Sequence, residues 1–74
     1  MLPPKNNSKW TELVKGNLNV NFSVFAGNML LNRLSRSVSK DSTQQNIQKC
    51  VDEAYDFFTR FDSIYKDELK TVFK

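Results

Sequence analysis

The 74-residue sequence contains no histidine and only one cysteine, and each shortage argues against a class of function. Histidine is the commonest general base and the commonest metal ligand, so its absence argues against both kinds of site. The single Cys50 cannot form an internal disulfide, which argues against a secreted disulfide scaffold and favours a reducing, cytoplasmic compartment. The sequence also lacks a glycine-rich phosphate loop. We therefore expect no enzymatic activity, no cofactor and no metal site.

Long apolar runs are missing as well. No run approaches the roughly 20 residues that span a bilayer, and the first ten residues lack the apolar core of a signal peptide. We therefore expect no membrane segment and no secretion signal. Residues 1–17 are expected to form a flexible tail with a short helix, and residues 18–74 a single dimerising helical domain. Dimerisation is a common remedy for the marginal stability of so small a chain.

Positive charge is concentrated in the first half of the chain. Residues 1–40 carry six cations and one carboxylate, a net charge of +5, whereas residues 41–74 carry five cations and seven carboxylates, a net charge of −2. Such asymmetry is typical of a protein that meets an anionic partner such as nucleic acid, or of charge complementarity between subunits. The charge pattern alone leaves both possibilities open.

Two short helices are predicted from cap and turn residues. Ser8 is expected to cap a helix over residues 9–15, which Gly16 would end. The pair at residues 27–28, Gly and Asn, is expected to form a turn and cap before a helix over residues 29–38.

The most regular apolar pattern begins at Thr43. Apolar residues recur at steps of four and three, as on one face of a helix, namely Ile47, Val51, Ala54, Phe58, Phe61, Tyr65 and Val72. Asp41 or Ser42 is expected to cap this helix. Continued to residue 73, the helix would be roughly 45 Å long, so it either packs partly on another chain or breaks near residues 62–63. Its aromatic end offers a surface for a protein partner, although such a stripe is more often core.

Residues 18–24 follow a different rhythm, in which apolar and polar side chains alternate strictly. This period of two is typical of a β-strand with one buried face. A lone strand cannot satisfy its backbone hydrogen bonds, and no other segment alternates in this way. We therefore predict that the strands of two chains pair across a homodimer, with three side chains pointing inward, Val20, Phe22 and Val24.

A strand followed by two helices is the order of a ribbon-helix-helix unit. Residues 18–58 resemble the Arc-like repressors of this family, with "NVNFSV" as ribbon, "NMLLNRLSRSV" as first helix and "STQQNIQKCVDEAYDFF" as second helix. The resemblance implies a dimeric transcriptional repressor, or a plasmid- or phage-type regulator, that reads the major groove of duplex DNA with its β-ribbon. In this hypothesis the base edges are contacted by Asn19, Asn21 and Ser23. The phosphates are contacted by Arg36, Lys40, Ser42, Thr43 and Gln44, the last three through free amides at a helix start. The dimer core consists of Val20, Phe22, Val24, Leu34, Ile47, Val51, Ala54 and Phe58.

An alternative interpretation treats residues 18–39 as one helix packed antiparallel on the last helix. This all-α hairpin would dimerise into a four-helix bundle and act as a protein-binding adaptor or small inhibitor that binds no nucleic acid. The asparagines at 19 and 21 are poor helix formers, and Gly27 would fall inside the helix, both of which weigh against it. The sequence leaves two fold classes open, a mainly helical fold with one β-strand and an all-helical fold.

Overall fold

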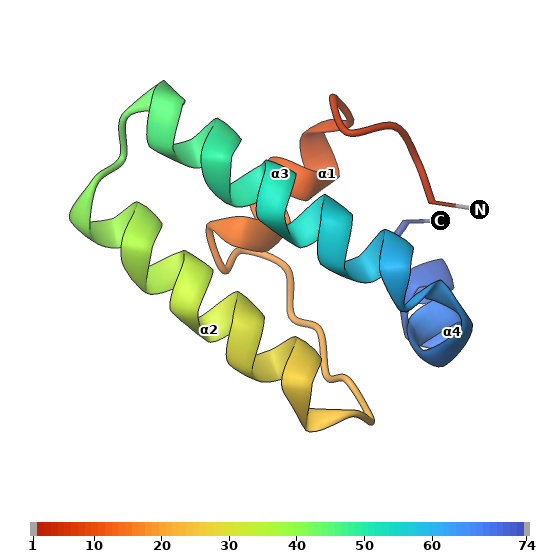
Figure 1. Cartoon of the computed structure of the whole chain (residues 1–74). Helices are drawn as coiled ribbons and strands as arrows, with labels where there is room; N and C mark the ends of the chain where they lie inside the picture. The colour runs from red at the N-terminus through yellow and green to blue at the C-terminus, as the bar shows by residue number, and fades with distance from the viewer. Residues whose placement is uncertain (1, 74) are drawn as a thin grey trace.

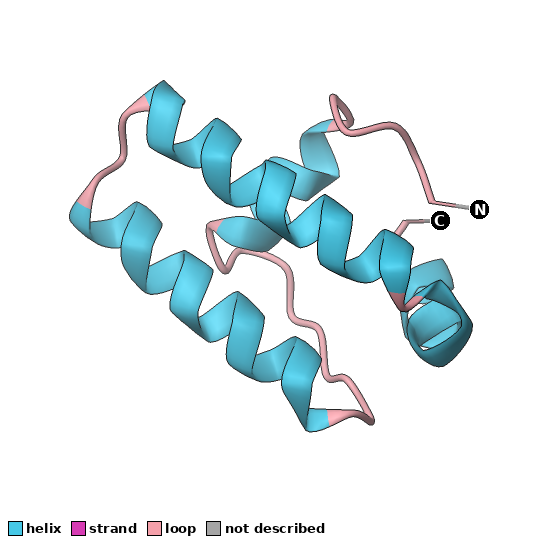
Figure 2. Ribbon diagram, in the orientation of Figure 1, coloured by secondary structure: helices cyan, strands magenta, loops and turns pink. Residues whose placement is uncertain are grey.

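The computed structural model describes residues 2–73, which form four α-helices and no β-strand (Figure 2). The helices are α1 (Ser8–Val14), α2 (Phe25–Lys40), α3 (Gln44–Arg60) and α4 (Asp62–Val72) (Figure 1). The predicted β-ribbon is therefore wrong. The fold is all-helical, but a single helix over residues 18–39 is also wrong, because α2 begins only at Phe25.

The helices α2 and α3 form an antiparallel hairpin (Figure 1). Asn46 in the first turn of α3 holds the short connection in place. Its side-chain amide donates to the carbonyl of Asp41 at 2.8 Å and to the carbonyl of Ser37 at 3.3 Å. The helix α1 packs across this hairpin and contacts both of its helices. The chain turns sharply after α3, so α4 is seen nearly end-on in Figure 1.

One hydrophobic core joins all four helices and the segment before α2. Its buried members are Trp10, Leu13, Val14, Phe22, Leu34, Val38, Ile47, Cys50, Val51, Ala54, Phe58, Tyr65 and Leu69. Phe58 is completely buried and contacts the ring of Phe22 with a centroid distance of 4.9 Å and the ring of Tyr65 at 5.3 Å. Because Trp10 is also completely buried, α1 belongs to the same core as the later helices.

The long C-terminal pattern is divided between two helices. The backbone leaves the helical region at Phe61, with φ −109° and ψ 29°, which is close to the break expected near residues 62–63. After the break, Tyr65 and Leu69 of α4 return to the same core. A single chain therefore buries much of the aromatic stripe, and the need for a second chain to cover it disappears. Dimerisation stays a prediction.

The helix starts differ in detail from those predicted. Asn7 caps α1 in place of Ser8, since its Oδ1 accepts a hydrogen bond from the amide of Lys9 at 2.9 Å. Thr43 caps α3, since its Oγ1 accepts from the amide of Asn46 at 3.3 Å. Asp41 assists by accepting from the amide of Thr43 at 3.2 Å. The expected end of the first helix at glycine is present, with a positive φ of 80° at residue 16.

Residues 27–28 lie inside the first turn of α2, where a turn before the helix was predicted. The reason is tertiary packing. A Cβ on Gly27 would lie 3.0 Å from a ring carbon of Tyr65 and 3.2 Å from the ring of Phe22, so any larger residue here would require these rings to shift. The amide of Gly27 also donates to the Tyr65 hydroxyl at 2.9 Å.

In the segment at residues 18–24, exposed side chains flank a buried one, as in a strand, but the backbone does not pair with another strand. Phe22 is buried, and the residues on either side of it are exposed. Val24, which was predicted to point inward, is 37% exposed. Side chains replace the missing partner strand: Asn28 accepts from the amide of Phe22 at 3.4 Å and donates to its carbonyl at 3.1 Å, and Glu68 accepts from the amide of Ser23 at 3.1 Å.

Candidate functional site

The residues predicted to contact DNA bases lie on the exposed side of the segment before α2. The side chains of Asn19, Asn21 and Ser23 all face solvent. The hydroxyl and the amide of Ser23 both donate to the carboxylate of Glu68 on α4. This carboxylate therefore lies beside the surface that was expected to face DNA.

The residues predicted to contact phosphates gather near the turn between α2 and α3. Arg36 and Lys40 line one shallow hollow of about 450 Å³, together with Asp41. The amide of Thr43, an expected phosphate ligand, already donates to the carboxylate of Asp41. The hollow lies near the end of α2, whereas Ser23 precedes its start, and a helix of this length spans roughly 24 Å. The structure thus brings together the expected cations but separates them from part of the expected base-contacting set.

The residues assigned to a dimer core are mostly buried within one chain. Leu34, Ile47, Val51, Ala54 and Phe58 are all at most 6% exposed. These five side chains are thus already buried in the core of the single chain and expose little surface to a second chain.

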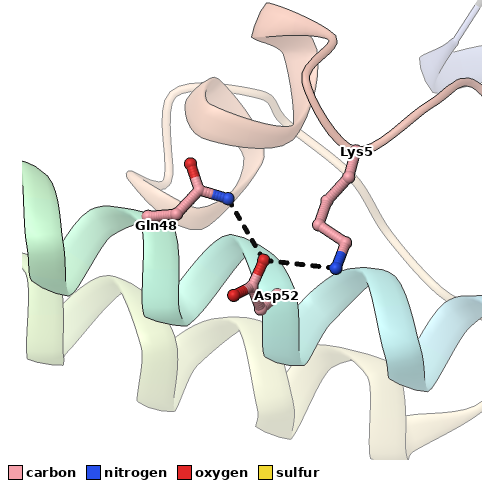
Figure 3. Close-up of polar contacts among 3 residues, drawn as sticks. All are labelled: Lys5, Gln48 and Asp52. Carbon is pink, nitrogen blue, oxygen red and sulfur yellow. Dashed lines mark hydrogen bonds and ion pairs between the residues drawn. The ribbon is translucent and has the colours of Figure 1, made fainter.

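Two acidic residues of α3 lie in ordinary surface contacts. The carboxylate of Asp52 accepts from Gln48 at 3.1 Å and lies 3.4 Å from the ammonium group of Lys5 (Figure 3). Glu53 pairs with Arg33 of α2. Within residues 2–73, no group of three histidine, cysteine or acidic side chains is placed to hold a metal ion.

The most unusual surface feature is a pair of exposed apolar side chains at the start of α2. Phe25 is 72% exposed and Met29 is 57% exposed. Successive helical residues are rotated by about 100°, so residues four apart lie on the same face. Gly27, which packs into the core, lies about 200° from each of them. Both side chains therefore project from the face of α2 opposite the core.

The same face continues toward the end of α2 with positive charge. Arg36 and Lys40 follow Phe25 at offsets of 11 and 15 residues, which places them within about 60° of it around the helix. We call Phe25, Met29, Arg36 and Lys40 the outer face of α2. The helix contains no carboxylate of its own, and no described residue forms an ion pair with either cation. The outer face thus combines an apolar half with a cationic half.

Sequence reasoning missed the apolar half because it placed the helix start at residue 29. Phe25 then fell outside the helix, and its i, i+4 relation to Met29 was not visible. A helix beginning at Phe25 would have revealed the pair, since neither residue fits the buried positions Gly27, Leu34 and Val38.

Among residues 2–73, no helix combines the length and the apolar character that crossing a bilayer requires. Comparison of the chain with protein-family models, with curated proteins and with solved structures finds no match.

Proposed function

We propose that the protein is a non-enzymatic helical adaptor that binds another protein through the outer face of α2. The observation that carries this proposal is the exposure of Phe25 and Met29 on consecutive turns of one helix. Large aromatic side chains dominate binding energy when a partner buries them, and Phe25 is the most exposed large apolar residue described in the chain. Helices that dock into grooves present anchors at this spacing.

The cationic half of the face indicates the chemistry of the partner. Arg36 and Lys40 follow the apolar pair along the helix, and Arg36 lies about 10 Å beyond Met29 at 1.5 Å per residue. A complementary partner therefore has an apolar groove that receives Phe25 and Met29, and carboxylates at one end of that groove. Charge complementarity of this kind mainly sets the association rate and the orientation of binding.

Duplex DNA is the competing partner, and only the two cations Arg36 and Lys40 support it. It leaves Phe25 and Met29 without a role, since phosphate contacts need only the cations. The predicted reading element, a β-ribbon, is absent, and a protein partner accounts for both halves of the face. We propose a cytoplasmic location for the complex, because the lone thiol of Cys50 is buried and free and the described chain contains no disulfide.

The test places a photo-crosslinking phenylalanine analogue at position 25 in the cells that make the protein. A crosslinked protein is then purified and titrated with the wild-type chain. We expect Phe25→Ser to weaken this binding by about tenfold or more, and the double variant Arg36→Glu/Lys40→Glu to slow association. Ile64→Ser is the matched control, because Ile64 is an exposed apolar residue of α4, outside the outer face, and should leave binding unchanged.

Three outcomes would contradict the adaptor function. Crosslinks only to a second copy of the chain would make the outer face a homodimer interface. Binding to duplex DNA that falls with salt and survives Phe25→Ser would favour the nucleic-acid partner. The absence of any crosslinked partner at position 25 would leave the exposed pair without a binding role.

A further inference from the structure

A second concave surface lies between the segment at residues 16–20 and the flank of α2. Its volume is about 360 Å³, which falls in the range of natural ligand pockets. Leu18 and Val20 line one wall, and Leu31 of α2 lines the other. Among residues 2–73, no charged side chain lines it. A bound ligand would therefore meet apolar groups and uncharged polar groups only.

Part of the main chain beside this groove forms no hydrogen bond within residues 2–73. The backbone N–H and C=O groups of residues 18–21 make no hydrogen bond with any other described residue. The nearest backbone pairing on either side involves Asn17, whose amide donates to the carbonyl of Glu12, and Phe22, which is held by Asn28. Figure 2 shows this stretch as an irregular connection running along α2. Unpaired backbone donors and acceptors of this kind are available to a second, extended chain.

Four asparagines line the groove, and two of them already have hydrogen-bonding partners. The side chain of Asn17 bonds to the carboxylate of Glu12, and the side chain of Asn28 bonds to the backbone of Phe22. The side chains of Asn19 and Asn32 line the groove from its two walls, and neither bonds to another described residue. A carboxamide offers both a donor and an acceptor, which matches the donor and acceptor of a peptide group.

We propose that this groove binds an extended, uncharged peptide segment of another protein. The segment pairs with the main chain of residues 18–21 as an added strand, and Asn19 and Asn32 bond to its peptide groups. One of its apolar side chains packs on Leu18, Val20 and Leu31. Main-chain pairing supplies affinity in this mode of recognition, and the pocket for alternate side chains supplies specificity. The site uses none of the four residues of the outer face of α2.

The chemistry of the lining selects this occupant. A charged ligand would lose its hydration without gaining an opposite charge, which is costly. A purely apolar ligand would leave the main chain of residues 18–21 and both carboxamides without partners. An extended peptide with uncharged side chains bonds to the backbone groups and the carboxamides, and it also packs on the apolar side chains of the two walls.

The test begins with a displayed library of random heptapeptides, selected on the wild-type chain and counter-selected on Asn19→Ala/Asn32→Ala. We expect enriched peptides that are uncharged at the central positions. On binding, the amides of residues 18–21 should become protected from hydrogen exchange. Phe25→Ser should bind the same peptides with unchanged affinity, which separates this site from the proposed adaptor surface.

N-methylation of the best peptide gives a matched pair of probes on the wild-type chain. In an added strand, alternate residues point their N–H groups toward the neighbouring strand. N-methylation in the register that faces residues 18–21 should therefore weaken binding by about tenfold or more, whereas N-methylation one residue along, which removes at most a bond to Asn32, should weaken it less. Failure to enrich any peptide, enrichment of charged peptides, or equal effects of the two N-methylations would overturn the proposal.

Discussion

The helix α3 and the segment at residues 18–24 both have a regular apolar pattern, yet only one of them forms the regular structure that its pattern indicates. In α3 the helical period places Ile47, Val51 and Phe58 in the core. In the segment the period of two puts Phe22 in the core and its neighbours in solvent. Both patterns therefore identify burial, but the segment is not a strand. Periodicity reports which side chains are buried, and backbone pairing depends on what else lies nearby.

The difference lies in where the backbone partners come from. A helix satisfies most of its backbone groups within its own residues, apart from those at its two ends. The segment instead receives its partners from side chains elsewhere in the chain, from Asn28 at Phe22 and from Glu68 at Ser23. Damage to α3 should therefore affect the whole fold, whereas damage to Asn28 or Glu68 should affect mainly the segment.

The largest effect is expected from Phe58→Ala, in the last turn of α3. Phe58 is completely buried and contacts Phe22 and Tyr65, so the substitution removes contacts to the segment and to α4. The expected loss is about 3–5 kcal/mol of unfolding free energy. Urea denaturation followed by circular dichroism measures it. Thr59→Ala, at an exposed neighbouring position, is the control and should change stability by no more than about 0.5 kcal/mol. A loss as small as this for Phe58→Ala would contradict the role of Phe58 in the hydrophobic core.

The next effect tests the segment, through Asn28→Ala. This substitution removes both hydrogen bonds that hold the backbone of Phe22. Asn32→Ala is the matched control, because it brings the same gain in helix propensity and its side chain bonds to no other described residue. We expect Asn28→Ala to be less stable than Asn32→Ala by about 1–3 kcal/mol.

Hydrogen exchange distinguishes local from global loss. In Asn28→Ala the amide of Phe22 should exchange faster, while the amides of the α3 core, such as that of Val51, should follow only the change in global stability. Equal acceleration at Val51 and Phe22 would show that the segment and α3 open together.

The sequence predicted the structure well where that structure is determined by residues close together in the chain. The buried face of α3 and the break after it follow from local spacing and from the limit on helix length, and both agree with the structure. The strand hypothesis failed because the groups that satisfy the segment could not be recognised in advance. Asn28 was assigned to a turn, and Glu68 lies 45 residues away from Ser23.

The outer face of α2 was recognised only in part from the sequence. Arg36 and Lys40 were identified from charge and do lie in one hollow. Phe25 was missed because Gly27 was expected to end a turn, whereas the approach of Tyr65 lets the helix include that glycine. A tertiary contact overrode local propensity, and a single sequence does not display such contacts.

Gly27→Ala should have a smaller effect, at the contact between α2, the segment and α4. Alanine is favoured over glycine in a helix by about 1 kcal/mol. However, the added Cβ would lie 3.0 Å from Tyr65 and 3.2 Å from Phe22, two rings packed in the core. Overpacking typically costs about 1–3 kcal/mol, so we expect a net loss of about 1 kcal/mol. Thermal denaturation measures the change.

A control for Gly27→Ala lies at the preceding residue. Ala26→Gly, at an exposed position, should lose the propensity term alone, about 1 kcal/mol. If Gly27→Ala is stabilising by a similar amount, the rings of Tyr65 and Phe22 yield to the added methyl group and the early start of α2 does not depend on the close approach.

The smallest effect concerns the contact between Ser23 and Glu68. The Ser23 hydroxyl and then the Ser23 amide donate to this carboxylate and lower its pKa below the ordinary value of 4.5, together with a backbone hydrogen bond from Glu68 itself. A carboxyl whose pKa is lower in the folded state stabilises that state above its unfolded pKa, and the contribution is lost as the pH falls through the folded pKa. The contact should therefore weaken only below about pH 4.5, and modestly, because it is exposed to solvent.

Carbon-detected NMR of the Glu68 carboxyl tests this contact directly. Ser23→Ala should raise the pKa toward its ordinary value without fully restoring it, because the amide of residue 23 still donates to the carboxylate. Ser63→Ala, at an exposed position in α4, should leave the pKa unchanged. The amide resonance of Ser23 should titrate with the same pKa as Glu68, since the two groups share a hydrogen bond. Independent titration of the two resonances would show that Glu68 does not hold the segment, and the backbone of Ser23 would then depend on water for its hydrogen bonds.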